Sequence, residues 1–301
     1  MTDFLTPDWI AVDWGTTNLR AWAMQGATVL DRASSDQGMG GLSRDGFEPA
    51  LASLISKWTA AGPVPVVACG MVGSRQGWVE APYRSVPCTP MDSNLTPAPV
   101  SCGLDVRIIS GLSQQAPADV MRGEETQIAG FLQLNPGWDG VLCMPGTHTK
   151  WVHLSAGEVV SFQTFMTGEL FALLSNASVL RHTVSGEGWD NQAFEKAVSD
   201  TLARPEKLAG MLFGLRAGQL LADTAPEQSR AALSGLLVGA ELAASRPYWL
   251  GQNLAILGTG TQANAYRNAL TPQGVSCLMV DTERATLAGL TAAYRLLREA
   301  P

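Results

Sequence analysis

Several patterns that define common protein classes are missing from this sequence of 301 residues. Its five cysteines include no CxxC pair, so neither a disulfide framework nor a paired-cysteine zinc site is expected. His148 and His153 have no cysteine or carboxylate at metal-ligand spacing. The Walker pattern G-x-x-x-x-G-K-[ST] and the motif G-x-S-x-G are absent, which excludes the commonest P-loop and α/β-hydrolase classes.

Positive charge and long apolar runs are also scarce. No Lys or Arg precedes Arg20 and no apolar stretch opens the chain, so we expect no secretory signal. The net charge is −7 without a dense Lys/Arg patch, which disfavours nucleic acid and anionic lipid as partners. The uncharged run 247–266 has too many amide and hydroxyl side chains for a membrane span. These features predict a cytoplasmic protein with reduced thiols that contacts neither membrane nor nucleic acid.

What is present is an α/β pattern in two halves. Hydrophobic residues make up 46% and charged residues 16% of the chain, as in a globular protein of about two domains. Asn135-Pro136-Gly137 is the best candidate boundary and gives domains 1–136 and 137–301. Apolar periodicity predicts strands at 9–14, 19–24, 64–70, 106–109, 140–144, 150–154, 253–257 and 276–281, and helices at 47–58, 124–134, 208–223, 231–246, 262–270 and 287–297. The small-residue helices between 208 and 246 fit either a core or the face of a homodimer.

Each half opens with a strand, a Gly-Thr turn and a second strand. The first unit is "AVDWGTTNLRAW" (11–22), and the second is "GVLCMPGTHTKWVHL" (140–154). Aligning Gly146 on Gly15 places Thr147 on Thr16, which indicates two related domains facing one another.

Asp13 ends the first apolar run, where a carboxylate is unexpected. The turn behind it offers successive backbone N–H groups and hydroxyls that suit phosphate oxygens. An acid beside phosphate needs a cation between them, and Mg²⁺ commonly bridges one carboxylate and a nucleotide phosphate. The alternative is an Asp that caps its own turn.

"LAILGTGTQANA" presents Gly258 and Gly260 between a strand and a helix. With Asp281 ending the next strand, the stretch also matches a Rossmann dinucleotide fingerprint. Too little chain follows for a complete doubly wound sheet, and a nicotinamide or flavin enzyme would leave both Gly-Thr hairpins unexplained.

Acidic and polar residues follow other predicted strands. In "MRGEETQ", Glu124 and Glu125 begin a helix and are either simple first-turn charge or a general base facing a cleft. In "TFMTGEL", Thr167 and Glu169 are either an N-cap and first-turn charge or ligand contacts. Lys150 either meets a phosphate or is an exposed hairpin residue. The loop "GMVGSRQGW" adds polar or stacking contacts at Ser74, Arg75 and Trp78.

Taken together and in order, "VDWGTTNLRAW", "GMVGSRQGW" with "APYRSVP", "MRGEETQ", "MPGTHTKWV", "FMTGEL" and "LSGLLVGAE" resemble the 2-keto-3-deoxygalactonate kinases. The similarity runs through nearly the whole chain. It implies an α/β fold of two ribonuclease H-like domains, as in the sugar kinase, hsp70 and actin-like ATPase superfamily, around an interdomain cleft that clamps ATP. It also replaces the Rossmann interpretation of 258–261.

The resemblance implies a role for each motif. Asp13 matches the acid that holds Mg²⁺, and the Glu124–Glu125 pair matches the acidic motif that positions the attacking nucleophile, with Glu125 preferred. Phosphate-binding positions are Gly15, Thr16, Thr17, Asn18, Gly146, Thr147, His148 and Lys150. Adenosine-side positions are Gly258, Thr259, Gly260 and Thr261. Substrate-binding positions are Ser74, Arg75, Trp78, Arg122, Thr167 and Glu169.

The implied reaction is ATP-dependent phosphorylation of 2-dehydro-3-deoxy-D-galactonate at its C6 hydroxyl, with Mg²⁺, ATP and a small sugar acid as the expected ligands. Three alternatives remain open. These are a kinase for another sugar acid, a phosphohydrolase resembling the exopolyphosphatases, and a non-catalytic sensor of nucleotide or sugar.

Overall fold

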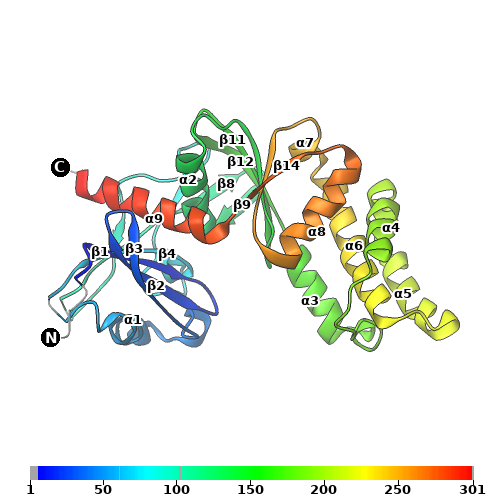
Figure 1. Ribbon diagram of the computed structural model, residues 1–301, viewed down its shortest axis with the longest axis horizontal. Helices are drawn as coiled ribbons and strands as arrows, with labels where there is room; N and C mark the ends of the chain where they lie inside the picture. Colours follow the sequence, from blue (N-terminus) through cyan, green and yellow to red (C-terminus); the bar gives the residue numbers. More distant parts are fainter. Residues whose placement is uncertain (1–5, 61, 102, 300–301) are drawn as a thin grey trace. The chain divides into compact units, whose positions relative to one another are not determined.

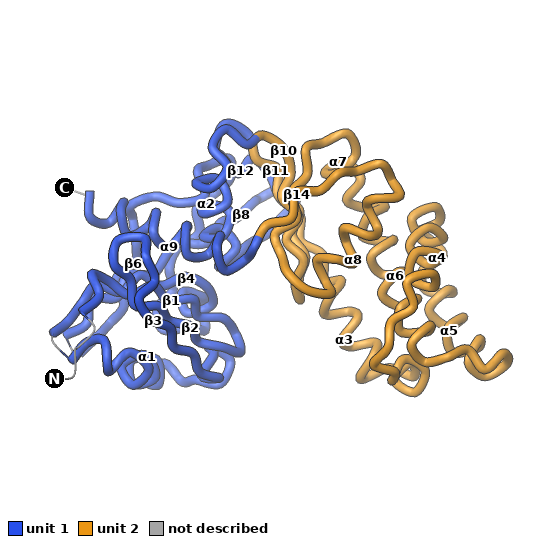
Figure 2. The backbone as a smooth tube through the Cα atoms, viewed as in Figure 1, with its two compact units in different colours: residues 1–138, 155–161, 281–301 blue, residues 139–154, 162–280 orange. Residues whose placement is uncertain are grey.

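The computed structural model describes residues 6–60, 62–101 and 103–299, which form two compact units. Unit 1 contains 1–138, 155–161 and 281–301, and unit 2 contains 139–154 and 162–280 (Figure 2). The units are therefore not two continuous halves of the chain, because the C-terminal helix belongs to unit 1. The domain limits 1–136 and 137–301 stay a prediction.

Unit 1 is built on a six-stranded sheet in the order β3-β2-β1-β4-β7-β6. Strands β1 to β4 of this sheet are labelled in Figure 1. Its strands are β1 (Trp9–Trp14), β2 (Leu19–Gln25), β3 (Thr28–Ser35), β4 (Pro65–Gly70), β6 (Thr96–Pro97) and β7 (Asp105–Ile108). A smaller sheet, β5-β8-β9, consists of β5 (Tyr83–Ser85), β8 (Gly111–Gln115) and β9 (Ala118–Met121). The helices are α1 (Phe47–Ile55), α2 (Glu124–Leu134) and α9 (Thr282–Glu299).

Side-chain alternation along β1 sorts its residues onto the two faces of the sheet. Val12 and Trp14 are buried in a cluster with residues of α1. Trp9 and Ala11 are buried in a second cluster with residues of α2 and α9. By the same alternation, Asp13 lies on the face covered by α2 and α9.

Helices α2 and α9 cross at two glycines that allow close approach. A Cβ on Gly130 would stand 1.8 Å from the Ala285 carbonyl oxygen, and one on Gly289 would stand 1.9 Å from the Thr126 carbonyl oxygen. No larger side chain fits either position without moving a helix. This contact fixes the N-terminal end of α2, where the Glu-Glu pair lies.

Unit 2 contains a five-stranded sheet in the order β12-β11-β10-β13-β14. Its strands are β10 (Gly140–Met144), β11 (Thr149–Ser155), β12 (Glu158–Phe165), β13 (Leu254–Leu257) and β14 (Cys277–Val280). In both sheets the first strand pairs antiparallel with the second and parallel with a strand that follows a helix. The strand order β3-β2-β1-β4-β7 thus recurs in unit 2, which confirms the repeat and the fold of two ribonuclease H-like domains.

The helices of unit 2 are α3 (Thr167–Ala177), α4 (Asn191–Ala203), α5 (Leu208–Ala222), α6 (Pro226–Ala244), α7 (Arg246–Trp249) and α8 (Gly260–Leu270). Short 3-10 helices cover Met39–Gly41, Arg44–Gly46, Met71–Gly73, Val179–His182, Pro205–Lys207 and Thr271–Gln273. Helix α6 is a core helix, whereas α5 buries none of its residues and exposes Phe213, Leu220 and Leu221. A homodimer through this helix stays a prediction. Among the described residues, no helix has both the length and the apolar character needed to cross a bilayer.

Candidate active site

Asp13 is the second-last residue of β1, and its side chain is 14% exposed. Its cross-strand partner Arg20 forms an ion pair with Oδ2. The other oxygen, Oδ1, lies 3.9 Å from the Cys69 sulfur on the neighbouring strand β4. The carboxylate therefore keeps one oxygen that no cation of the described chain occupies.

The first turn, Gly15 to Asn18, has all of its carbonyl groups engaged. The Asn18 oxygen accepts the Gly15 N–H, and the oxygens of 15, 16 and 17 accept the N–H groups of Met39, Gly40 and Gly38 at 2.9–3.1 Å. A Cβ on Gly38 would stand 2.2 Å from the Thr17 carbonyl carbon. The N–H groups of 16–18 have no acceptor in the described chain, and these residues are exposed. The turn thus presents donors to solvent, as an anion site requires.

Glu124 and Glu125 occupy the first turn of α2 in different environments. Glu124 is half-buried, and its Oε2 accepts the Arg122 N–H at 3.1 Å. Glu125 is fully buried, and its Oε2 accepts the Gly123 N–H at 2.6 Å. Burial, followed by the charge of Glu124, raises the pKa of Glu125 to about 8. At neutral pH the pair therefore carries less negative charge than two free carboxylates.

Cys69 links these acids to Asp13. Burial raises the pKa of the Cys69 thiol, and the charges of Asp13 and Glu125 raise it further. Beside it, Gly70 and Gly123 both have positive φ, and a Cβ on Gly123 would stand 3.3 Å from the Gly70 Cα. Asp13 and the Glu-Glu pair thus lie around one point, at the ends of β1 and β4 and the start of α2.

Arg122 places a buried guanidinium beside the loop 70–78, which follows β4. It is 8% exposed, its Nη2 donates to the Ala81 oxygen at 2.7 Å, and its Cζ lies 4.4 Å from the centre of the Tyr83 ring. Its Nε and Nη1 have no acceptor in the described chain. The hydroxyl of Ser74, which is 5% exposed, is also without a partner there. Buried donors of this kind require a ligand or water.

Two other residues of the loop 70–78, Trp78 and Arg75, differ in exposure. Trp78 is 5% exposed and packs on Trp14 and Phe47 with ring centres 6.2 Å apart. Arg75 is exposed, and its backbone oxygen accepts a hydrogen bond from Arg44. Trp78 thus packs in the core beneath the first turn.

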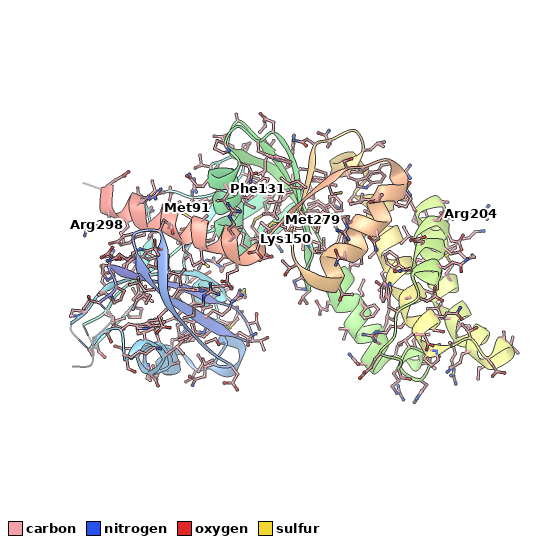
Figure 3. The ribbon with its side chains drawn as sticks, in the orientation of Figure 1. Met91, Phe131, Lys150, Arg204, Met279 and Arg298 are labelled. Atoms are coloured by element: carbon pink, nitrogen blue, oxygen red, sulfur yellow. The ribbon has the colours of Figure 1, made fainter. Side chains whose placement is uncertain are left out.

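The second turn, in unit 2, is held by two helices. The Thr147 oxygen accepts the Glu169 N–H, and the Gly146 oxygen accepts the Gln262 side-chain amide, both at 2.9 Å. His148 Nε2 lies 2.6 Å from Glu169 Oε2. The N–H groups of 146–148 have no acceptor in the described chain. Lys150, labelled in Figure 3, is 5% exposed and is therefore not a solvent-facing hairpin residue.

Glu241 is a buried acid of unit 2 that sequence reasoning did not assign. It is 3% exposed on α6, and it accepts hydrogen bonds from Trp151 Nε1 at 2.7 Å, from the Tyr266 hydroxyl at 2.6 Å and from the Thr167 hydroxyl. In the sequence, the feature that could have indicated a functional Glu241 is its position as the acid at the end of the apolar stretch "LSGLLVGAE". Thr167 donates its hydroxyl to this carboxylate, and its contact with substrate stays a prediction.

A cavity of about 520 Å³ in unit 2 adjoins the end of the Gly-Thr-Gly-Thr stretch. Gly260 has a φ of +77° and begins α8, directly after β13 and its loop. The cavity is lined by Thr167, Phe171, Trp189, Arg230, Thr261 and Tyr266, among others. Its apolar and aromatic walls with a few polar groups are typical of a small-molecule site.

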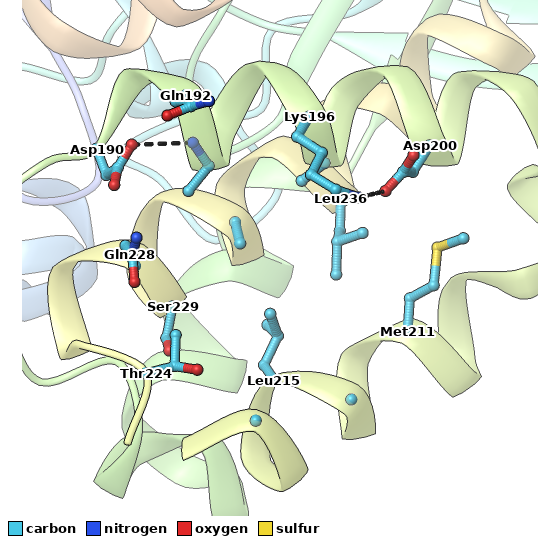
Figure 4. A pocket seen from close by; sticks show the side chains of 15 residues that line it. Asp190, Gln192, Lys196, Asp200, Met211, Leu215, Thr224, Gln228, Ser229 and Leu236 are labelled. Atoms are coloured by element: carbon cyan, nitrogen blue, oxygen red, sulfur yellow. Dashed lines mark hydrogen bonds and ion pairs between the residues drawn. The ribbon is translucent and has the colours of Figure 1, made fainter. Parts of the chain in front are cut away.

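A second cavity of unit 2, about 480 Å³, lies among α4, α5 and α6 (Figure 4). Its rim carries the ion pair of Lys196 with Asp200 and the N-cap of α4, Asp190. No residue predicted from sequence to bind a ligand lines it.

Two ribonuclease H-like domains, each with a Gly-Thr hairpin turn of open N–H groups, define the class of actin-like ATPases and sugar kinases. Within that class, the chain belongs to the 2-keto-3-deoxy-galactonokinase family, whose model matches residues 13–293. It is a carbohydrate kinase.

Individual relatives agree with this family. A 2-dehydro-3-deoxygalactonokinase from Escherichia coli is 38% identical over 95% of this chain and 97% of its own length. A relative from Rhizobium meliloti whose name gives the same enzyme is 39% identical over 95% and 96%. A Sinorhizobium meliloti crystal structure described as this enzyme superposes with a TM-score of 0.91 at 38% identity, covering 97% of this chain and all of the other.

A more distant structure shares the fold alone. It is the activator of the 2-hydroxyisocaproyl-CoA dehydratase from Clostridium difficile with bound ADPNP, which has a TM-score of 0.53 at 11% identity and covers 96% of this chain and 95% of the other.

Proposed function

We propose that this chain transfers the γ-phosphoryl group of ATP to the C6 hydroxyl of 2-dehydro-3-deoxy-D-galactonate. The products are 2-dehydro-3-deoxy-6-phosphogalactonate and ADP. The observation that carries the proposal is the family match over 13–293, which includes every predicted site residue. Since the reaction uses ATP, we place it in the cytoplasm.

Phosphoryl transfer depends mainly on positioning and on stabilising charge. The open N–H groups of Thr16, Thr17 and Asn18 in unit 1, and of Gly146, Thr147 and His148 in unit 2, are our candidates for the β- and γ-phosphates. Buried Lys150 adds positive charge to the second set. Gly258 to Thr261 and the adjoining cavity are the candidates for adenosine.

Asp13 fits a Mg²⁺ ion that accompanies ATP. Mg²⁺ keeps several waters and takes one or two carboxylates plus substrate phosphates, so a full protein cage is not required. Arg20 occupies Oδ2, and Oδ1 stays available beside the first turn. When bound there, the ion supplies charge neutralisation for the phosphates.

The proton acceptor comes from the Glu124–Glu125 pair. Within this pair, the sequence resemblance favoured Glu125 as the acceptor. Glu125 is fully enclosed and already accepts the Gly123 N–H, whereas Glu124 is half-buried. We therefore favour Glu124 as the base that takes the C6 hydroxyl proton while the oxygen attacks phosphorus and ADP departs. Glu125 then positions the start of α2.

Arg122 is our candidate for the carboxylate of the sugar acid. Its guanidinium has two N–H positions without an acceptor in the described chain, and a planar fork suits a carboxylate. Ser74 supplies a hydroxyl nearby. Trp78 supports this loop from the core, and Arg75 is exposed in the middle of it. Thr167 and Glu169 contact the second turn or its surroundings, so we assign them to the nucleotide side.

A panel of sugar acids with ATP tests the proposal by ADP release. We expect release that depends on 2-dehydro-3-deoxy-D-galactonate and falls with its C4 epimer. Release without any sugar acid would indicate a hydrolase, which the family match does not favour, and release with a different sugar acid alone would reassign the substrate.

A further inference from the structure

The carboxyl of Glu241 lies in the interior of unit 2 and takes no part in the proposed transfer. Its hydrogen-bond donors are uncharged groups from three different elements. Trp151 belongs to β11, Thr167 is the first residue of α3, and Tyr266 belongs to α8. The Tyr266 hydroxyl is also 2.8 Å from the Thr149 hydroxyl, at the first residue of β11.

Each of these three elements also touches the second turn. Strand β11 follows the turn directly in sequence. Helix α3 contributes the Glu169 N–H to the Thr147 oxygen, and a Cβ on Gly168 would stand 2.3 Å from the Gly146 oxygen. Helix α8 contributes the Gln262 side-chain amide to the Gly146 oxygen. The elements that surround the turn therefore meet again at one carboxyl group.

We propose that Glu241 is a positioning residue for nucleotide binding, which sets the geometry of the second turn by joining β11, α3 and α8 behind it. The turn's carbonyls then face α3 and α8, and its N–H groups stay open for phosphate. This inference rests on the proposed function only in taking the second turn as a nucleotide phosphate site.

The chemistry of the site supports a positioning role over a purely structural one. Burial raises the pKa of Glu241, and the hydrogen bonds from Thr167, Tyr266 and Trp151 oppose that rise. Burying an acid carries a free-energy cost that an apolar side chain in a core helix would avoid. What the acid provides is directional bonds to several elements at once.

Direct binding of ADP, measured by calorimetry on the full chain, tests this inference. Thr167→Val removes one donor and leaves the carboxyl, and Glu241→Gln keeps the shape but changes the acceptor. A hydrogen bond to a charged group contributes enough that we expect ADP affinity to fall about tenfold in each variant. In steady-state kinetics the KM for ATP should rise while the KM for the sugar acid stays unchanged.

Two further variants separate positioning from general loss of stability. Thr167→Ser restores the hydroxyl and should restore ADP affinity. Thr201→Val also removes a buried hydroxyl in unit 2, but that hydroxyl donates only to the Ala197 oxygen within α4 and, more distantly, to the Met211 sulfur, so ADP affinity should be unchanged.

Wild-type ADP affinity in folded Thr167→Val would overturn the inference, even where Glu241→Gln fails to fold. An equal loss of affinity in Thr201→Val would also overturn it. Failure of the proposed function is distinguishable, because the wild type would then bind ADP without phosphorylating 2-dehydro-3-deoxy-D-galactonate.

Discussion

The two turns of this protein have the same backbone role but different support. In unit 1 the carbonyls of the turn accept N–H groups from the segment Gly38 to Gly40, so the turn is held by backbone–backbone hydrogen bonds. In unit 2 they accept a helix N–H and the side chain of Gln262. The comparison teaches that the repeated fold fixes where the turn lies, whereas the contacts that hold it differ between the two units.

The acids differ between the units in a related way. Unit 1 has Asp13 near the end of β1, and unit 2 has Met144 at the corresponding position of β10. Unit 2 instead has Glu241 behind its turn. Among the described residues each unit buries one carboxyl group, Glu125 and Glu241, and in unit 1 a second, more accessible acid, Glu124, lies next to it. The chemistry is therefore expected in unit 1, and nucleotide positioning in unit 2.

The largest effect should come from Asp13→Asn. Loss of the charge that pairs with Mg²⁺ removes several kcal/mol of charge stabilisation, so we expect kcat to fall about a thousandfold with the fold intact. Circular dichroism and steady-state kinetics at saturating Mg²⁺ measure this. Asp8→Asn is the matched control, since Asp8 precedes β1 and its side chain accepts the Gly26 N–H. Near-normal turnover of Asp13→Asn would remove the metal role.

The Glu-Glu pair gives the next largest effect. Glu124→Gln should lower kcat about a hundredfold or more, because a general base contributes on that scale. Glu125→Gln should lower it less, since the amide can still accept the Gly123 N–H. Single-turnover rates at saturating ATP and sugar acid distinguish the two variants. The opposite ranking would restore Glu125 as the base and assign Glu124 to positioning.

Local patterns predicted much of this architecture from the sequence. Helix α2 has the expected limits of 124 and 134, because Gly123 with a φ of +102° precedes it and Asn135-Pro136-Gly137 follows it. Both Gly-Thr hairpins and both flanking strands were also predicted. Helix α4 was missed, although its buried residues recur at helical spacing from Phe194 to Leu202 and Asp190 caps it.

The parts of the site that were not predicted depend on contacts between distant residues. Nothing local to Glu241 points to Trp151 or Tyr266, and nothing near the first turn points to Gly38 as the residue behind it. Trp78 has an aromatic side chain of the kind that stacks on ligands, but its position beside Trp14 and Phe47 places it in the core. Such partners are set by tertiary packing.

The segments that hold the two turns can be compared directly by replacing one glycine in each with alanine, which adds a methyl group. Gly38→Ala would place Cβ 2.2 Å from Thr17, and Gly168→Ala would place it 2.3 Å from the Gly146 oxygen, so each turn must shift. We expect each to lower kcat/KM for ATP about tenfold, as small displacements of a positioned group do. Gly41→Ala is the control, because no atom lies within 4 Å of its Cβ position. If only one variant loses activity, the two turns do not share a phosphate role.

The smallest effect concerns pH and stability. A carboxyl group whose pKa rises to about 8 on folding favours the folded state when protonated, so its contribution is lost as pH rises from about 4.5 to about 8. Glu125→Gln has no such group. Thermal unfolding between about pH 5 and about pH 9 should therefore show the wild type losing more stability than Glu125→Gln. Parallel pH curves for wild type and Glu125→Gln would show that the Glu125 carboxyl is not neutral in the folded protein.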